Sequence, residues 1–178
     1  MSQGYRAVTV ADIVRRAGIA RNTFYENFSS KEDCFLAAQE FAVGEVLQLI
    51  VDAASKVDSW QARVDAGLSA FLRYVASEPA LARACIVDAL SAGPAALARY
   101  EESLQSFVPL FRIGRVVSPH GEDLPATLEE TIIGGVFWIV YQRIILGETE
   151  EIEQLRPELL EFSLTPYIGA EAAKRASA

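Results

Sequence analysis

The segment from Val8 to Asp33, VTVADIVRRAGIARNTFYENFSSKED, constrains the fold most, because it predicts two short helices about a tight turn. In the first helix, Thr9 is placed to cap the free N–H groups. Four apolar side chains then follow at the i, i+3, i+4 and i+7 spacing of one helix face: Val10, Ile13, Val14 and Ala17. Gly18 is expected to end this helix, since a residue without Cβ enters the left-handed region at little cost.

The second helix is predicted to have one apolar and one polar face. Phe24 and Phe28 are four residues apart and share its inner side, and Ile19 is expected to point inward from the turn. The outer face and its flanks carry Arg21, Asn22, Thr23, Tyr25, Glu26 and Asn27. These side chains can hydrogen-bond to base edges in the major groove. A merely solvated face would look similar, but the turn and both apolar faces coincide, which favours DNA binding.

A third helix is predicted to begin at the motif S-x-x-E formed by Ser29 and Glu32, a capping box. Lys31 lies in its first turn. A positive charge is unfavourable there, because the helix dipole attracts negative charge at the N-terminus. Contact with a DNA phosphate would explain the lysine.

The pattern T-V-x-D-I-x-x-x-A-G-I-x-x-x-T-F-Y-x-x-F-x-S-K-E-D resembles the helix-turn-helix of tetracycline-repressor (TetR) type transcriptional regulators. The resemblance covers Gly4 to about Ala38 and is looser at Pro166 to Ala173, PYIGAEAA. It implies that Ala20 to Phe28 is the recognition helix. Base contacts would then come from Arg21, Asn22 and Thr23, and phosphate contacts from Thr9, Tyr25, Asn27 and Lys31.

Two departures from the family pattern shape our expectations. Ala20 stands where the family usually has a capping serine, so the recognition helix is expected to fray. The family also places an amphipathic helix before Gly4, where this chain offers only Met1, Ser2 and Gln3. An upstream start, a shortened chain and a true loss are all open. Without that helix, part of the cover is expected to be missing from Val10, Ile13, Phe24 and Phe28.

Charge is divided along the chain of 178 residues, whose net charge is −8. Residues 1–31 hold five basic and two acidic side chains, a net charge of +3, which leaves −11 for the remainder. A basic end suits DNA phosphates, and an acidic body would help to orient it. Cys34 and Cys85 lack the close spacing of redox or zinc motifs, so we expect core residues rather than a redox sensor, in a cytoplasmic protein without a signal peptide.

The body is predicted to be all-α, because only helical periods separated by turn signals follow Lys31. We therefore expect a helix-turn-helix domain over 1–37, joined directly to a ligand-binding and dimerisation domain over 38–178. The predicted helices span about 31–56, 59–77, 79–90, 94–112, 124–146 and 151–173.

The run Ile132 to Leu146 is apolar nearly all round, so it must be buried on more than one side. It is too short for a membrane span and is interrupted by Gln142 and Arg143. The expected explanation is a homodimer built as a four-helix bundle, with a monomer core helix as the alternative. The interface residues would be Gly134, Gly135, Phe137, Leu159 and Phe162.

Aromatic residues crowd the middle helices, where most are ordinary core. Pockets are also lined by such side chains with few polar groups, and the family resemblance implies a small apolar effector. The candidate lining residues are Phe71, Tyr74, Cys85, Phe107, Phe111, Trp138 and Tyr141.

No catalytic, cofactor or metal motif stands out, and the single histidine, His120, lies in a predicted turn. The sequence therefore predicts no enzyme and no cofactor. It predicts a homodimeric, ligand-responsive repressor that binds double-stranded DNA at a pseudo-palindromic operator, without a membrane partner. The alternative is a helical dimeric module that senses a ligand or binds a protein but no longer binds DNA.

Overall fold

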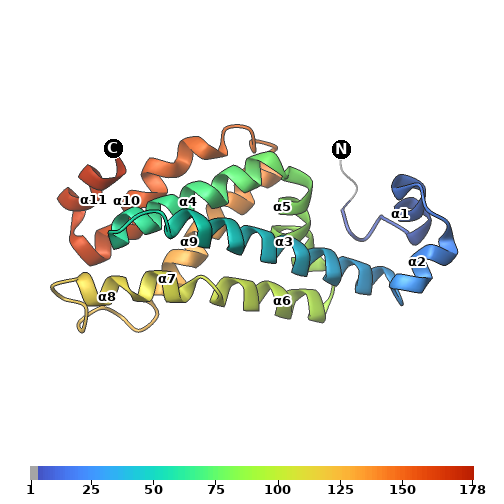
Figure 1. The fold of residues 1–178 in the computed structure, drawn as a ribbon, viewed down its shortest axis with the longest axis horizontal. Helices are drawn as coiled ribbons and strands as arrows, with labels where there is room; N and C mark the ends of the chain where they lie inside the picture. The colour runs from blue at the N-terminus through green and yellow to red at the C-terminus, as the bar shows by residue number, and fades with distance from the viewer. Residues whose placement is uncertain (1–3) are drawn as a thin grey trace.

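The computed structural model describes residues 4–178, which form helices and their connections without any strand. The molecule is elongated, with the two short helices α1 (Val10–Ala17) and α2 (Arg21–Asn27) at one end (Figure 1). Helix α3 (Lys31–Ala54) runs from there into the body. The expected all-α architecture is therefore confirmed, whereas Met1, Ser2 and Gln3, on which the question of a preceding helix turns, lie outside the described residues.

Local sequence explains where the first helices begin and end. Thr9 caps α1 in a capping box with Asp12, and Gly18 ends it in the left-handed region at φ 68°. The cap of α3 is Ser30, one residue later than predicted, and its hydroxyl accepts the backbone N–H of Asp33 at 3.0 Å. The Asp33 carboxylate in turn accepts the backbone N–H of Ser29 at 2.8 Å, so Asp33 takes the part expected of Glu32.

The body contains more helices than predicted, in part because two long segments are interrupted. The segment 94–112 breaks after Gln105, and Pro109, which has no N–H to donate, lies in the first turn of the next helix. The segment 151–173 breaks at Gly169, which adopts φ 79°. The elements are α4 (Trp60–Ser77), α5 (Pro79–Ile86), η1 (Asp88–Ser91), α6 (Pro94–Gln105), α7 (Val108–Arg112), α8 (Gly114–Val117), α9 (Leu128–Leu146), η2 (Ile152–Leu155), α10 (Arg156–Ile168) and α11 (Ala170–Ser177).

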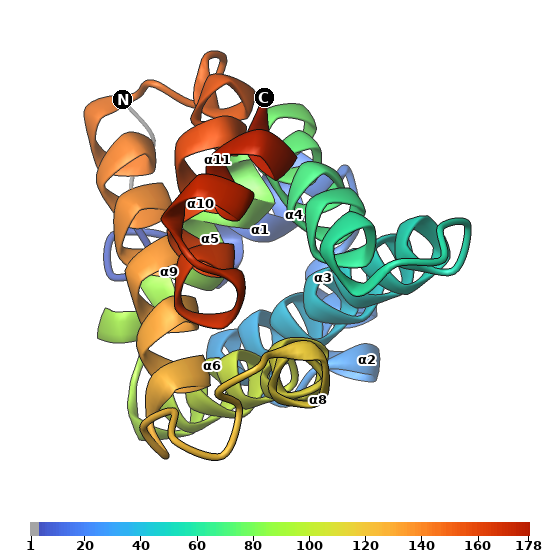
Figure 2. The ribbon, with the colours of Figure 1, turned by 90° about the vertical axis from the view of Figure 1, so that its left-hand side faces the viewer.

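The core joins these helices in two clusters. The larger cluster gathers apolar side chains of α3, α4, α5 and α9, and the smaller one, at the end of the molecule away from α1 and α2, is centred on Trp60 and Tyr167 (Figures 1 and 2). By length and composition alone α3 could cross a membrane, but one of its faces packs in the core, where Ala42, Val46 and Ile50 are buried.

A buried ion pair fixes the connection between α8 and α9. Arg115 donates two hydrogen bonds to the carboxylate of Glu129, at 2.6 and 3.0 Å, and Tyr167 donates its hydroxyl hydrogen at 3.2 Å. Arg115 also donates hydrogen bonds to the carbonyl oxygens of Gly121, Leu124 and Pro125. Burial alone would raise the pKa of Glu129, but these hydrogen bonds and the arginine charge outweigh it and lower that pKa.

Candidate DNA-binding surface and ligand cavity

Helix α2 has the two-faced character that the sequence predicts. Phe24 is 1% exposed and its ring lies 5.4 Å from that of Phe28, centroid to centroid, so these two rings anchor the helix to the domain. Phe24 thus stays covered, although no residue of α1 is buried. Ile19, expected to point inward, is instead exposed in the turn.

The outward side chains of α2 are the predicted DNA contacts. Tyr25 is 47% exposed, and its hydroxyl lies 3.5 Å from the Arg21 guanidinium. Asn27 donates its amide to the carbonyl of Thr23 at 2.8 Å, which leaves its amide oxygen free to accept. Within residues 4–178, the side chains of Asn22 and Thr23 make no hydrogen bond. Donors and acceptors are therefore available along this face.

Thr9 and Lys31, the two predicted phosphate contacts outside α2, have partners within the domain. The Thr9 hydroxyl bonds Asp12 as the helix cap. The Lys31 ammonium donates to the carbonyls of Tyr5 and Val8, at 3.0 and 2.9 Å, and lies 4.2 Å from the centroid of the Tyr5 ring. These contacts explain a lysine in the first turn of α3 independently of the predicted phosphate contact. Its role toward DNA stays a prediction.

The first half of α3, which continues from the helix-turn-helix into the body, is held at several points. The Tyr5 ring packs on Phe35 with centroids 4.8 Å apart. On α3, the buried Gln39 donates to the carbonyl of Ala96 in α6 at 3.3 Å, and Glu40 pairs with Arg99 at 3.2 Å. A shift of α6 would therefore be passed on to the start of α3.

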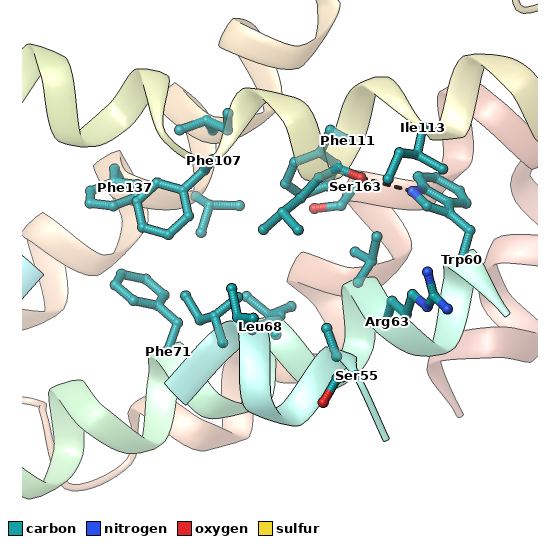
Figure 3. Close-up of a pocket in the computed structure, with 18 residues that line it drawn as sticks. Ser55, Trp60, Arg63, Leu68, Phe71, Phe107, Phe111, Ile113, Phe137 and Ser163 are labelled. Carbon is teal, nitrogen blue, oxygen red and sulfur yellow. Dashed lines mark hydrogen bonds between the residues drawn. The ribbon is translucent and has the colours of Figure 1, made fainter. Parts of the chain in front are cut away.

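The body has a cavity of about 410 Å³ between α3, α4, α7 and α9, and one end of it reaches the surface, where Ser55 and Arg63 are exposed (Figure 3). One end carries the rings of Phe71, Phe107 and Phe137. The other end carries the polar groups Ser55 and Arg63, and there the indole N–H of Trp60 donates to the carbonyl of Leu110 at 2.9 Å. The cavity is thus mainly apolar with one cationic end.

Arg63 supplies the positive charge at that end. Its Nε donates to the carbonyl of Val57 at 3.1 Å, and its terminal nitrogens have no hydrogen-bond partner among the described residues. The remaining wall is aliphatic or aromatic, apart from Ser163 of α10, whose hydroxyl donates to the carbonyl of Leu159 at 2.7 Å. Such a cavity suits a long apolar molecule with an anionic group at one end.

A second cavity of about 40 Å³ lies beyond the three phenylalanines and is lined by Tyr74 and Cys85 among others. The Tyr74 hydroxyl is buried and has no partner within the described chain. Burial raises the pKa of Tyr74 to about 12 and that of Cys85 to about 11, so both groups are neutral at physiological pH.

The predicted cavity residues therefore divide into three groups. Phe71, Phe107 and Phe111 line the large cavity, and Tyr74 and Cys85 line the small one. Trp138 and Tyr141 line neither, which corrects the prediction for them.

Trp138 lies on the outer side of α9, where its ring stacks on that of the partly buried Tyr141 with centroids 5.5 Å apart. Trp138 is 58% exposed, and across the surface Phe162 of α10 is 48% exposed. Gly134 is exposed too, and an added Cβ at Gly135 would meet the Phe162 ring at 3.2 Å. This surface is apolar although no residue of the described range 4–178 covers it.

Two predicted interface residues point the other way. Phe137 lines the cavity and Leu159 packs in the core, so neither lies on the outer surface. The physical reason is that successive residues of a helix are about 100° apart, and α9 is apolar on all sides. Composition therefore could not separate Phe137 from its neighbour Trp138.

Sequence reasoning missed Arg63 and the aliphatic lining. A usable signal existed in α4, because Trp60, Val64, Gly67 and Phe71 recur at three- and four-residue intervals and do share the cavity wall. Nothing in the pattern distinguished that face from ordinary core.

An exposed polar helix after a tight turn, joined to a helical body with a cavity, defines a helix-turn-helix domain on an all-α body. Residues 1–38 match the family model described as bacterial regulatory proteins of the tetR family. That match covers α1, α2 and the start of α3, so it describes the helix-turn-helix end of the chain.

Two solved structures share the fold over 92% of this chain. The fatty acid degradation regulator FadR from Bacillus halodurans has a TM-score of 0.79 and 18% identity, with 87% of that chain covered. The regulator FadR from Bacillus subtilis, in complex with stearoyl-CoA, has a TM-score of 0.77 and 16% identity, with 90% covered. No curated protein sequence matches the chain. The matched family and both similar structures are regulators, not enzymes.

Proposed function

We propose that this chain is a cytoplasmic repressor that binds a pseudo-palindromic operator as a homodimer and releases it when a long apolar effector fills the cavity. The observation that carries the DNA-binding part is the orientation of α2. Phe24 is buried beneath it, while Arg21, Asn22 and Thr23 face outward with hydrogen-bonding groups. This is the arrangement that base reading in a major groove requires.

The DNA contacts divide by chemistry. Arg21, Asn22 and Thr23 are proposed to meet base edges, which determine sequence preference. Thr9, Tyr25, Asn27 and Lys31 are proposed to meet phosphates, which set position and overall affinity. For Lys31, one ammonium hydrogen is left after its bonds to Tyr5 and Val8.

The homodimer is proposed to form through the outer surface of α9 and α10. Trp138 and Phe162 are large, apolar and exposed there, and Gly134 leaves room for close approach of a partner helix. An exposed apolar surface of this kind favours association with a second copy, because burying it removes apolar area from water. Two antiparallel helices from each subunit would give a four-helix bundle.

The effector is proposed to be a fatty acyl compound with an anionic head group. The cavity has a long apolar interior and a cation, Arg63, at one end. The similar FadR structure with stearoyl-CoA adds support, since that ligand combines an acyl tail with an anionic head. Effector binding would lower the affinity for DNA. The size of this decrease is limited by how much more tightly the effector binds the dimer geometry that does not fit DNA.

The test begins with selection of DNA from a random pool by the purified chain, followed by a gel shift of the selected sequence with and without stearoyl-CoA. We expect an inverted repeat to be enriched and stearoyl-CoA to release it. Failure to enrich any sequence would reject the repressor and favour the alternative, a helical dimeric module that no longer binds DNA.

A further inference from the structure

Three aromatic rings form the wall between the large and the small cavity. Phe71, Phe107 and Phe137 are the residues that line both cavities within the described chain. They come from α4, the start of α7 and α9, so three separate elements meet at this wall (Figure 3).

The wall is well packed. The ring centroids of Phe71 and Phe137 lie 5.1 Å apart, those of Phe107 and Phe137 lie 5.6 Å apart, and those of Phe71 and Phe107 lie 6.4 Å apart. These separations are those of favourable aromatic pairs. All three side chains belong to the buried core, so moving one of them disturbs its neighbours.

The wall stands at the end of the cavity opposite to Arg63 (Figure 3). A bound ligand with an anionic head and an apolar tail would therefore have its head near Arg63 and its tail directed at the three rings. This step rests on the proposed effector class. The end of the tail then meets Phe71, Phe107 and Phe137 before anything else that closes the cavity.

The space behind the wall is a poor place for a longer tail. The small cavity has a volume of about 40 Å³, against about 410 Å³ for the large one, and most of the residues that line it are apolar. A tail that grows past the rings must therefore displace close-packed side chains, which costs free energy.

We propose that Phe71, Phe107 and Phe137 select the length of the acyl chain by forming an end wall that the tail abuts. Tails up to the wall gain affinity with each added methylene, about fourfold per group if fully buried. Longer tails must displace a ring toward the small cavity, so their affinity stops rising. Opening the wall moves this break to longer chains.

The experiment measures dissociation constants by calorimetry for saturated acyl-CoA thioesters from octanoyl to stearoyl, and in parallel for the free fatty acids of the same lengths. The variant Phe107→Leu replaces one ring of the wall by a smaller apolar side chain. The matched control is Phe111→Leu, which removes a ring that lines only the large cavity. If Phe107→Leu does not fold, Phe71→Leu opens the same wall.

We expect the chain length at which affinity stops rising to increase in Phe107→Leu and to stay unchanged in Phe111→Leu. The same result is expected in whichever series binds, the acyl-CoA thioesters or the free fatty acids. A break that is the same in both variants and the wild type, or that moves equally in both variants, would overturn the end wall while leaving the effector class intact. If no acyl compound of any length binds the wild type, the proposed effector class fails and the end wall fails with it.

Discussion

Thr23 and Tyr25 are two residues apart on α2 and are both exposed, yet we expect them to act differently on DNA. Replacing Thr23 by Val keeps its shape but removes the hydroxyl proposed to contact a base. The expected cost is about 1–3 kcal/mol for the preferred sequence, with relaxed preference at that base position. Binding measured by fluorescence anisotropy on single-base variants of the selected DNA shows this directly.

Tyr25→Phe removes only the hydroxyl proposed to contact a phosphate. Affinity should fall by about 1 kcal/mol for every sequence, without a change in preference. The two variants serve as controls for each other in the same anisotropy series. Equal loss on all sequences from Thr23→Val, or a changed preference in Tyr25→Phe, would contradict the division of roles.

Glu129 is the residue whose replacement should cost most stability, because it is buried and holds Arg115 and Tyr167 together. Glu129→Gln leaves Arg115 without its counter-charge, and we expect the free energy of unfolding to fall by about 3 kcal/mol. Glu40→Gln is the matched control, since its pair with Arg99 is exposed and contributes at most about 1 kcal/mol. Urea unfolding of both variants decides this, and equal losses would refute the structural role of Glu129.

At the scale of elements, α9 performs two tasks with adjacent residues: Phe137 faces the cavity and Trp138 faces outward. Trp138→Glu should therefore dissociate the dimer without closing the cavity, because a charge at the interface must be desolvated. Light scattering measures the mass. Val116→Glu is the control, since Val116 is 86% exposed on α8, away from the proposed interface. A Trp138→Glu protein with the mass of a full dimer would place the interface elsewhere.

The elements also show how far sequence reasoning reaches. The positions of α1 and α2 are predicted closely by Thr9, Gly18 and the spacing of Phe24 and Phe28. Local sequence suffices there because caps and turns act through neighbouring residues. The direction of Phe137 and Trp138 was assigned wrongly. Their burial depends on helices distant in the sequence, and a helix apolar on all sides gives no facing signal. The cation Arg63 was missed for the same reason, since only the folded body brings it to the cavity.

At the scale of the whole molecule, the titration of Glu129 should govern part of the stability at acid pH. Its pKa is lowered below the ordinary value of 4.5 in the folded state, because its bonds to Arg115 outweigh its burial. The folded protein therefore prefers the ionised form. This contribution is present above pH 4.5 and is lost as pH falls through the lowered pKa.

Thermal unfolding followed by circular dichroism from pH 7 to pH 3 measures this loss. The wild type should lose stability toward acid more steeply than Glu129→Gln, which has no carboxyl group to protonate at that position. Parallel curves for the two proteins would show that the pair does not couple to pH.

In the proposed mechanism, the outer face of α2 binds DNA and a ligand in the cavity ends this binding. The most direct measurement is the affinity of the wild type for its selected DNA during a titration with stearoyl-CoA, repeated with a variant whose cavity is obstructed, Val64→Trp. We predict that stearoyl-CoA releases the DNA from the wild type and has a much weaker effect on the variant. Equal release from both proteins, or none from the wild type, would contradict the link between the cavity and α2.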